Sequence, residues 1–111
     1  MHEIVRGRAK RVLVIGSVTG SPDISPDAAL APDGMLIVME ENAERAAQMR
    51  DRLSRDGLTK RTVIGGDPKR MLYKLAGPFD VIFYNPAYAP LRPQLEKLLA
   101  TDGVLITDDQ S

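Results

Sequence analysis

A glycine turn and a more distant carboxylate are the residues of this chain with the clearest chemical potential. Residues 11–21 read RVLVIGSVTGS, so a short apolar run breaks into a turn that contains Gly16 and Gly20. A second apolar run ends on Glu40, about twenty residues after that turn, the spacing at which an acidic side chain meets a ribose hydroxyl in dinucleotide-type sites. The pattern predicts a nucleotide-like ligand, although Val18 stands where such a loop usually carries glycine.

The composition limits the classes of protein to consider. The chain has 111 residues, enough for one domain with a real core, and its 15 basic and 15 acidic residues cancel. This balance argues against nucleic acid or an anionic membrane as partner. Cysteine is absent, and we find neither a membrane-spanning run nor the apolar core of a signal peptide. We therefore expect a single domain over residues 1–111 in the cytoplasm.

Five apolar runs of strand length alternate with segments of helical periodicity. The expected strands are residues 12–15, 35–39, 61–64, 80–84 and 104–107. Four of these runs lack polar alternation, which is typical of parallel strands buried on both faces. The alternation of strand and helix predicts right-handed crossovers and a layered α/β domain.

Capping residues predict where the helices of this domain begin. Asn42 is expected to cap the first long helix, and Asp67, which precedes a proline, is expected to start the next. A further helix is expected to begin near Pro93. The first crossover, residues 21–34, contains three prolines, which leave at most a short helix from about Pro26.

In their order, these segments resemble a class I S-adenosylmethionine-dependent methyltransferase, most closely the small O-methyltransferases of the catechol and caffeoyl-CoA type. The segments that match are VLVIGSVTGS, APDGMLIVMEENAERA, GGDPKRML, GPFDVIFYNPAY and DGVLITDD, between Arg11 and Asp109. The resemblance implies a three-layer Rossmann-like fold with a mostly parallel sheet of about five strands in the order 3-2-1-4-5. The family's final strand pair is expected to be missing, so the chain would be a truncated member.

The resemblance also implies that S-adenosylmethionine binds at the carboxyl ends of the strands. Gly16, Ser17 and Gly20 would line the loop beside the methionine part of the cofactor, because glycine lets backbone approach a ligand closely. Val14 replaces an acidic residue of the family pattern, and Val18 replaces its middle glycine. We therefore expect cofactor binding to be weak or lost.

The remaining cofactor contacts follow from the same resemblance. Glu40 would accept hydrogen bonds from both ribose hydroxyls, while Asp67 and Pro68 would flank the adenine. Each acidic residue has a structural alternative. Glu40 could be a solvated carboxylate at the start of a helix, and Asp67 could be an N-cap.

Oxygen-bearing residues follow the fourth and fifth expected strands. Asn85, Asp108 and Asp109 match the positions that hold a divalent cation in the family's metal-dependent members, and their oxygens suit magnesium or calcium. Asn85 and Tyr88 would lie near the methyl acceptor, with Tyr88 at the position of the family's lysine. The alternative for the two aspartates is that they are solvated carboxylates near the end of the chain.

The residues NPAY, from Asn85 to Tyr88, allow a second interpretation. They differ by one residue from the [D/N]-P-P-[Y/F] loop of amino-group methyltransferases. In that loop the polar side chain accepts hydrogen bonds from the target amine, and the aromatic ring packs on the substrate. A tight Asn-Pro turn explains the same four residues.

The function that we predict from the sequence is S-adenosylmethionine-dependent methyl transfer to a small molecule, with activity that is weak or lost. Two alternatives are a degenerate methyltransferase fold that binds or scaffolds without catalysis, and an amino-group methyltransferase. A dinucleotide-binding oxidoreductase is a more distant one. Because an uncovered sheet edge or helix face must be paired or hidden, we also expect a homodimer.

Overall fold

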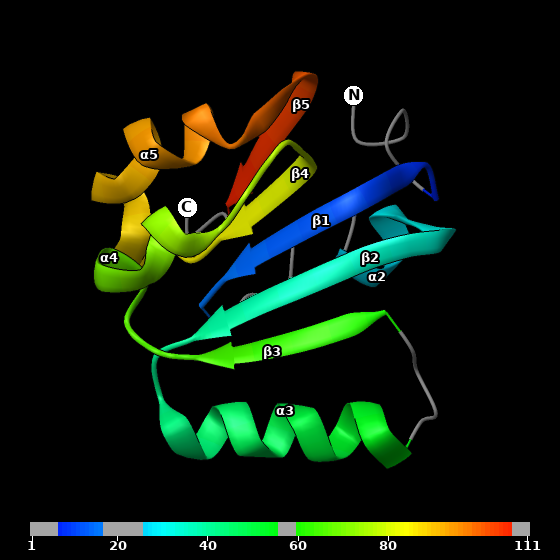
Figure 1. Cartoon of the computed structure of the whole chain (residues 1–111), viewed down its shortest axis with the longest axis vertical. Helices are drawn as coiled ribbons and strands as arrows, with labels where there is room; N and C mark the ends of the chain where they lie inside the picture. The colour runs from blue at the N-terminus through cyan, green and yellow to red at the C-terminus, as the bar shows by residue number, and fades with distance from the viewer. Residues whose placement is uncertain (1–6, 17–25, 56–59, 108–111) are drawn as a thin grey trace.

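A single five-stranded sheet forms the centre of the computed structural model, which describes residues 7–16, 26–55 and 60–107. The strands are β1 (Ala9–Ile15), β2 (Leu30–Glu40), β3 (Arg61–Gly65), β4 (Phe79–Tyr84) and β5 (Leu99–Thr107). Their order in the sheet is β3-β2-β1-β4-β5, and every neighbouring pair is parallel. The predicted strand order is therefore confirmed, and all carboxyl ends meet at one edge of the sheet (Figure 1).

Short helical segments connect the strands. They are α2 (Pro26–Ala29), α3 (Ala43–Arg55), α4 (Pro68–Met71) with the 3₁₀ helix η1 (Leu72–Lys74), and the 3₁₀ helix η2 (Pro86–Leu91) followed by α5 (Arg92–Lys97). The chain steps in one direction from β1 to β3 and in the other direction from β3 to β5, so right-handed crossovers place helices on both faces. Figure 1 shows α4 and α5 in front of the sheet and α2 behind it. None of the helices in the described ranges is long and apolar enough to cross a membrane.

Apolar side chains cover both faces of the sheet. Val12 and Val14 of β1 point into one core cluster, and Leu13 and Ile15 point into the other, because side chains alternate along a strand. The first cluster includes Ala29 of α2, whereas the second holds the residues that α4, η1, η2 and α5 contribute. Burial on both faces explains why most of these strands lack polar alternation in the sequence.

The strand β2 begins earlier than the sequence indicates. Its pairing with β1 shifts in register, because Ala9 pairs with Leu30 while Arg11 pairs with Met35. Gly34 lies inside this shifted segment, and a Cβ there would come within 2.7 Å of the Ala9 carbonyl oxygen. The short helix expected from about Pro26 is confirmed as α2, and the chain then continues directly as strand β2.

Candidate functional site

The carboxyl ends of β1, β2 and β4 bring together four of the predicted site residues. Gly16 follows β1, Glu40 ends β2, and Asn85 and Tyr88 follow β4. A pocket of about 300 Å³ lies at this edge. Its lining residues come from these three strand ends and the segments after them: Gly16, Glu40, Glu41, Asn42, Arg45, Asn85, Ala87 and Tyr88.

Backbone hydrogen bonds hold the strand ends at fixed positions. The amide of Gly16 donates to the carbonyl of Met39 at 2.8 Å, and the amide of Asn85 donates to the carbonyl of Ile15 at 3.0 Å. These bonds extend the parallel ladder by one residue beyond β1 and β4. Gly16 and Asn85 are consequently joined to the sheet by backbone hydrogen bonds.

Gly16 adopts a conformation that suits glycine. Its φ is +81°, and a Cβ at this position would lie 2.7 Å from Cε2 of Tyr88 and 3.2 Å from Cβ of Asn85. Both the backbone angle and the close approach therefore disfavour any other residue. The structure thus gives a physical reason for the glycine that the sequence pattern singled out.

Glu40 is the one buried charged residue that the described ranges contain, and its exposed fraction is only 3%. Its Oε2 atom accepts a hydrogen bond of 2.8 Å from the amide of Asn42. Asn42 in turn caps α3, because its Oδ1 atom accepts from the amide of Arg45 at 2.9 Å. The interpretation of Glu40 as a solvated carboxylate is therefore wrong, since this side chain faces the pocket from a buried position.

Tyr88 closes one side of the pocket. Its hydroxyl donates a hydrogen bond to Oε1 of Glu41. Burial raises the pKa of the Tyr88 phenol above its usual range, and the hydrogen bond to Glu41 acts in the same direction. The negative charges of Glu41, Glu40 and Asp67 add to this effect. The phenol is therefore protonated at neutral pH and acts as a hydrogen-bond donor.

Asn85 begins the η2 helix. Its Oδ1 atom accepts a hydrogen bond of 2.9 Å from the amide of Ala87, and its carbonyl accepts one of 2.8 Å from the amide of Tyr88. An Asn-Pro turn of this kind is one of the two interpretations that the NPAY residues allowed. The turn places Asn85 and Tyr88 on the same side of the pocket.

Asp67 and Pro68 lie at the end of β3, outside the residues that line this pocket. The Oδ1 atom of Asp67 accepts a hydrogen bond of 3.0 Å from the amide of Lys69, so the N-cap interpretation of Asp67 is confirmed. The amide of Gly66 donates to the carbonyl of Glu40 at 3.0 Å, which fixes this turn beside the end of β2. Contact of Asp67 and Pro68 with an adenine ring stays a prediction.

Four predicted site residues cannot be placed. Ser17, Gly20, Asp108 and Asp109 lie outside the residues that the structure describes. Within the described ranges, no three His, Cys, Asp or Glu side chains are grouped so that they could hold a metal ion. The cation site formed by Asn85 and the two aspartates therefore stays a prediction.

Two of the lining residues, Glu41 and Arg45, had no role of any kind in the sequence-based predictions. Both follow from the position of the α3 cap at Asn42. Glu41 immediately precedes this cap, and Arg45 lies in the first turn of the helix that begins after it. Their side chains therefore lie at the carboxyl edge of the sheet, a placement that the cap position alone could have indicated.

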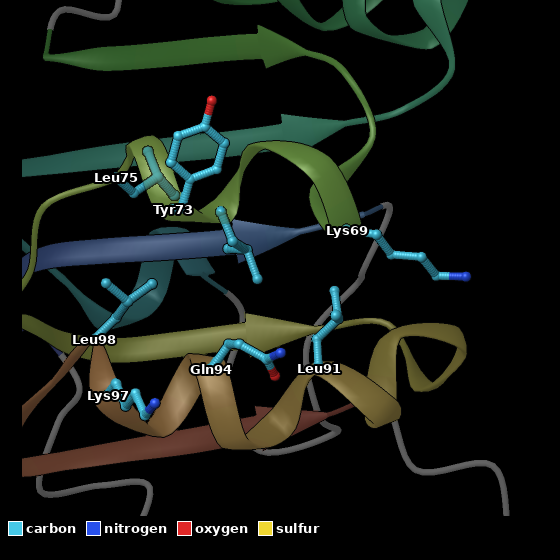
Figure 2. Close-up of a pocket in the computed structure, with 8 residues that line it drawn as sticks. Lys69, Tyr73, Leu75, Leu91, Gln94, Lys97 and Leu98 are labelled. Carbon is cyan, nitrogen blue, oxygen red and sulfur yellow. The ribbon is translucent and has the colours of Figure 1, made fainter.

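A second hollow, of about 390 Å³, lies between η1 on one side and η2 and α5 on the other. Figure 2 shows it between two segments, with Tyr73 and Leu75 on one side and Leu91, Gln94 and Leu98 on the other. Lys69 and Lys97 also line it, and Tyr73 is 78% exposed. Leucines thus form an apolar groove with two basic residues at its margin, separate from the carboxyl-edge pocket.

Known proteins are similar to this chain in sequence and in fold. No protein-family model matches it. The chain is 33% identical over 109 residues to a catechol O-methyltransferase of Niastella koreensis, a match that covers 92% of this chain and 49% of the relative. The chain therefore spans about half the length of the curated relative that it matches.

Solved protein structures are also similar to this chain in sequence and in fold. The O-methyltransferase TomG from Streptomyces achromogenes, in complex with SAM, is 29% identical with a TM-score of 0.70, and the match covers 96% of this chain and 52% of TomG. The cofactor-bound protein Rv0187 from MTB is 28% identical with a TM-score of 0.74, and the match covers 89% of this chain and 48% of that protein.

The strand order and these matches together define the fold of the chain. The chain has the Rossmann-like fold of the S-adenosylmethionine-dependent methyltransferases. In sequence it is similar to a catechol O-methyltransferase and to the O-methyltransferase TomG, in agreement with the resemblance that the motifs indicate. The amino-group methyltransferase, the dinucleotide oxidoreductase and the non-catalytic scaffold are not favoured by these matches.

Proposed function

We propose that this chain binds S-adenosylmethionine in the pocket between Gly16 and Glu40 and serves methyl transfer to a hydroxyl group of a small molecule. The observation that carries the proposal is the buried carboxylate of Glu40 beside a glycine whose Cβ position is closely surrounded. Each hydroxyl of a ribose can donate a hydrogen bond to a carboxylate that lines the pocket, and hydrogen bonds to an ionised acceptor are among the stronger ones. The O-methyltransferase relatives support this choice of ligand.

The residues after β4 would lie toward the methyl acceptor. S-adenosylmethionine, when bound, supplies a methyl group on a positively charged sulfur. We propose that Asn85 and Tyr88 face this end of the cofactor, since both line the pocket from the β4 side. Because its phenol is protonated at neutral pH, Tyr88 would orient a partner by donating a hydrogen bond and would not accept the proton of the acceptor hydroxyl.

The proposed binding can be tested at Glu40. Isothermal titration of the wild-type chain with S-adenosylmethionine, up to millimolar ligand, should give a saturable signal. Glu40→Gln should weaken binding by about 10- to 100-fold, because hydrogen bonds to a charged acceptor contribute about 1.5–3 kcal/mol. Glu44→Gln is the matched control, since Glu44 is an exposed acid in the first turn of α3 that does not line the pocket. Absence of binding by the wild type would refute the proposal.

A divalent cation held by Asn85, Asp108 and Asp109 is a further part of the proposed function. Carboxylate and amide oxygens are suitable ligands for magnesium. Adding magnesium should raise the Tm of the wild-type chain and leave that of Asp108→Asn with Asp109→Asn unchanged. Equal shifts in both proteins would show that these aspartates do not hold the ion.

We also propose that the chain forms a homodimer in the cytoplasm. We expect neither nucleic acid nor a membrane as its partner. Among the described strands, β5 pairs on one side only, with β4. An edge strand with an unpaired side favours association with a second copy. Sedimentation velocity at micromolar concentration should detect a homodimer, and a monomer over the whole concentration range would contradict it.

A further inference from the structure

The ring of Tyr88 lies across the same part of the site that the proposed ligand must cover. It contacts the backbone at Gly16, where a Cβ would come within 2.7 Å of Cε2 and 3.3 Å of Cδ2. The hydroxyl reaches Glu41, the residue that follows Glu40. The side chain therefore connects the segment after β4 to the start of α3 by passing over the end of β1, and it is only 8% exposed.

A ligand that contacts both Gly16 and Glu40 has to follow nearly the same path. The pocket beside the ring has a volume of about 300 Å³. Pockets that enclose drug-sized ligands range from about 300 to 1,000 Å³. The remaining space is thus at the lower end of that range, and the Tyr88 ring occupies volume that would otherwise belong to the site.

We propose that Tyr88 is a gate: in the free chain it closes the cofactor pocket through its hydrogen bond to Glu41, and S-adenosylmethionine is admitted only after this bond opens. This inference rests on the proposed function. In this role the hydrogen bond between Tyr88 and Glu41 controls entry of the cofactor. This role is distinct from contact of Tyr88 with the bound methyl acceptor.

Two features allow the gate to open. Tyr88 belongs to η2, a 3₁₀ helix, and the hydrogen bonds of such helices have poorer geometry than those of an α-helix. Glu41 is exposed, so water can solvate its carboxylate once the phenol leaves. The bond therefore connects a buried ring to a group at the protein surface, and breaking it leaves no charge without solvent.

Titration calorimetry with S-adenosylmethionine on three proteins tests the gate. Tyr88→Phe removes the hydroxyl and keeps the ring, so we expect its Kd to fall by about tenfold relative to the wild type. Glu41→Gln removes the charge of the acceptor on an exposed residue, and its Kd should fall by a smaller factor. Tyr73→Phe is the matched control, because Tyr73 is exposed and lines the other hollow. Its Kd should equal that of the wild type.

A spectroscopic measurement reports on the ring itself. The chain has 3 tyrosines, so ¹³C labelling of the tyrosine rings gives few NMR signals, and the Tyr88→Phe protein identifies those of Tyr88. Adding S-adenosylmethionine to the wild type should move the Tyr88 signals toward their positions in ligand-free Glu41→Gln. Signals that do not move on saturation with ligand would overturn the gate.

The outcomes separate the gate from the proposed function. If wild type and Tyr88→Phe bind equally, or if the variant binds more weakly, the gate is overturned while cofactor binding stands. If the wild type binds and Tyr88→Phe binds more tightly, both are supported. If the wild type does not bind, the proposed function is refuted and the gate is refuted with it.

Discussion

Replacing Gly16 with alanine tests the close contact between the end of β1 and the Tyr88 ring. Gly16 has a φ of +81°, and an L-residue in this left-handed region costs about 1–2 kcal/mol. The added Cβ would also lie 2.7 Å from Cε2 of Tyr88, so the ring must shift, and overpacking of this kind costs about 1–3 kcal/mol. We therefore expect Gly16→Ala to lower the free energy of unfolding by about 2–5 kcal/mol.

Urea denaturation with matched variants separates the two contributions. Gly7 has a φ of +68° and no heavy atom within 4 Å of its ideal Cβ, so Gly7→Ala carries the backbone cost without the contact. Gly16→Ala should be destabilised more than Gly7→Ala by about 1–3 kcal/mol. This excess should disappear when Gly16→Ala is made in a Tyr88→Ala background. Equal destabilisation of the two glycine variants would refute the reasoning about the Tyr88 ring.

Substitutions at three further positions address stability elsewhere in the fold. Asp67→Ala removes the N-cap of α4 and should cost about 1 kcal/mol in urea denaturation, whereas Asp67→Asn should retain most of that amount. Leu95→Ala, at a side chain with 0% exposure, should cost about 2–5 kcal/mol, and a loss below 1 kcal/mol would mean that α5 does not pack as described. The hydrogen bond and the charge of Lys10 lower the pKa of the Asp33 carboxyl, so its stabilisation is present above about pH 4 and is lost as the pH falls through the lowered value. Asp33→Asn should therefore show a shallower decrease of the urea midpoint below pH 4 than the wild type, a difference that 1 M salt should remove.

Much of the fold is predictable because it depends on interactions between near neighbours in the sequence. Asn42 and Asp67 cap the helices that follow them, through hydrogen bonds to amides two or three residues away. Apolar runs without polar alternation predicted central parallel strands, and the strand order follows from the family resemblance. Even Gly16 was recognisable, since its turn directly follows the first apolar run.

The predictions were less complete where a contact joins distant segments. The long β2 strand depends on a register shift against β1, and nothing in residues 30–34 indicates that pairing. The strand β5 also begins before the expected residues 104–107, because its first residue, Leu99, pairs with Phe79 on β4. Pairing across the sheet, and not a local pattern, sets where such a strand begins.

The sequence by itself determined the central part of each strand, the helix caps, the glycine after β1 and the acidic residue that ends β2, because each of these is encoded within a few neighbouring residues. Only the tertiary structure decided that Glu40 is buried and that Tyr88 reaches Glu41, 47 residues away. The physical reason is that parallel pairing brings the ends of β1, β2 and β4 to one edge of the sheet. Which side chains meet there depends on register and packing, which no local pattern records.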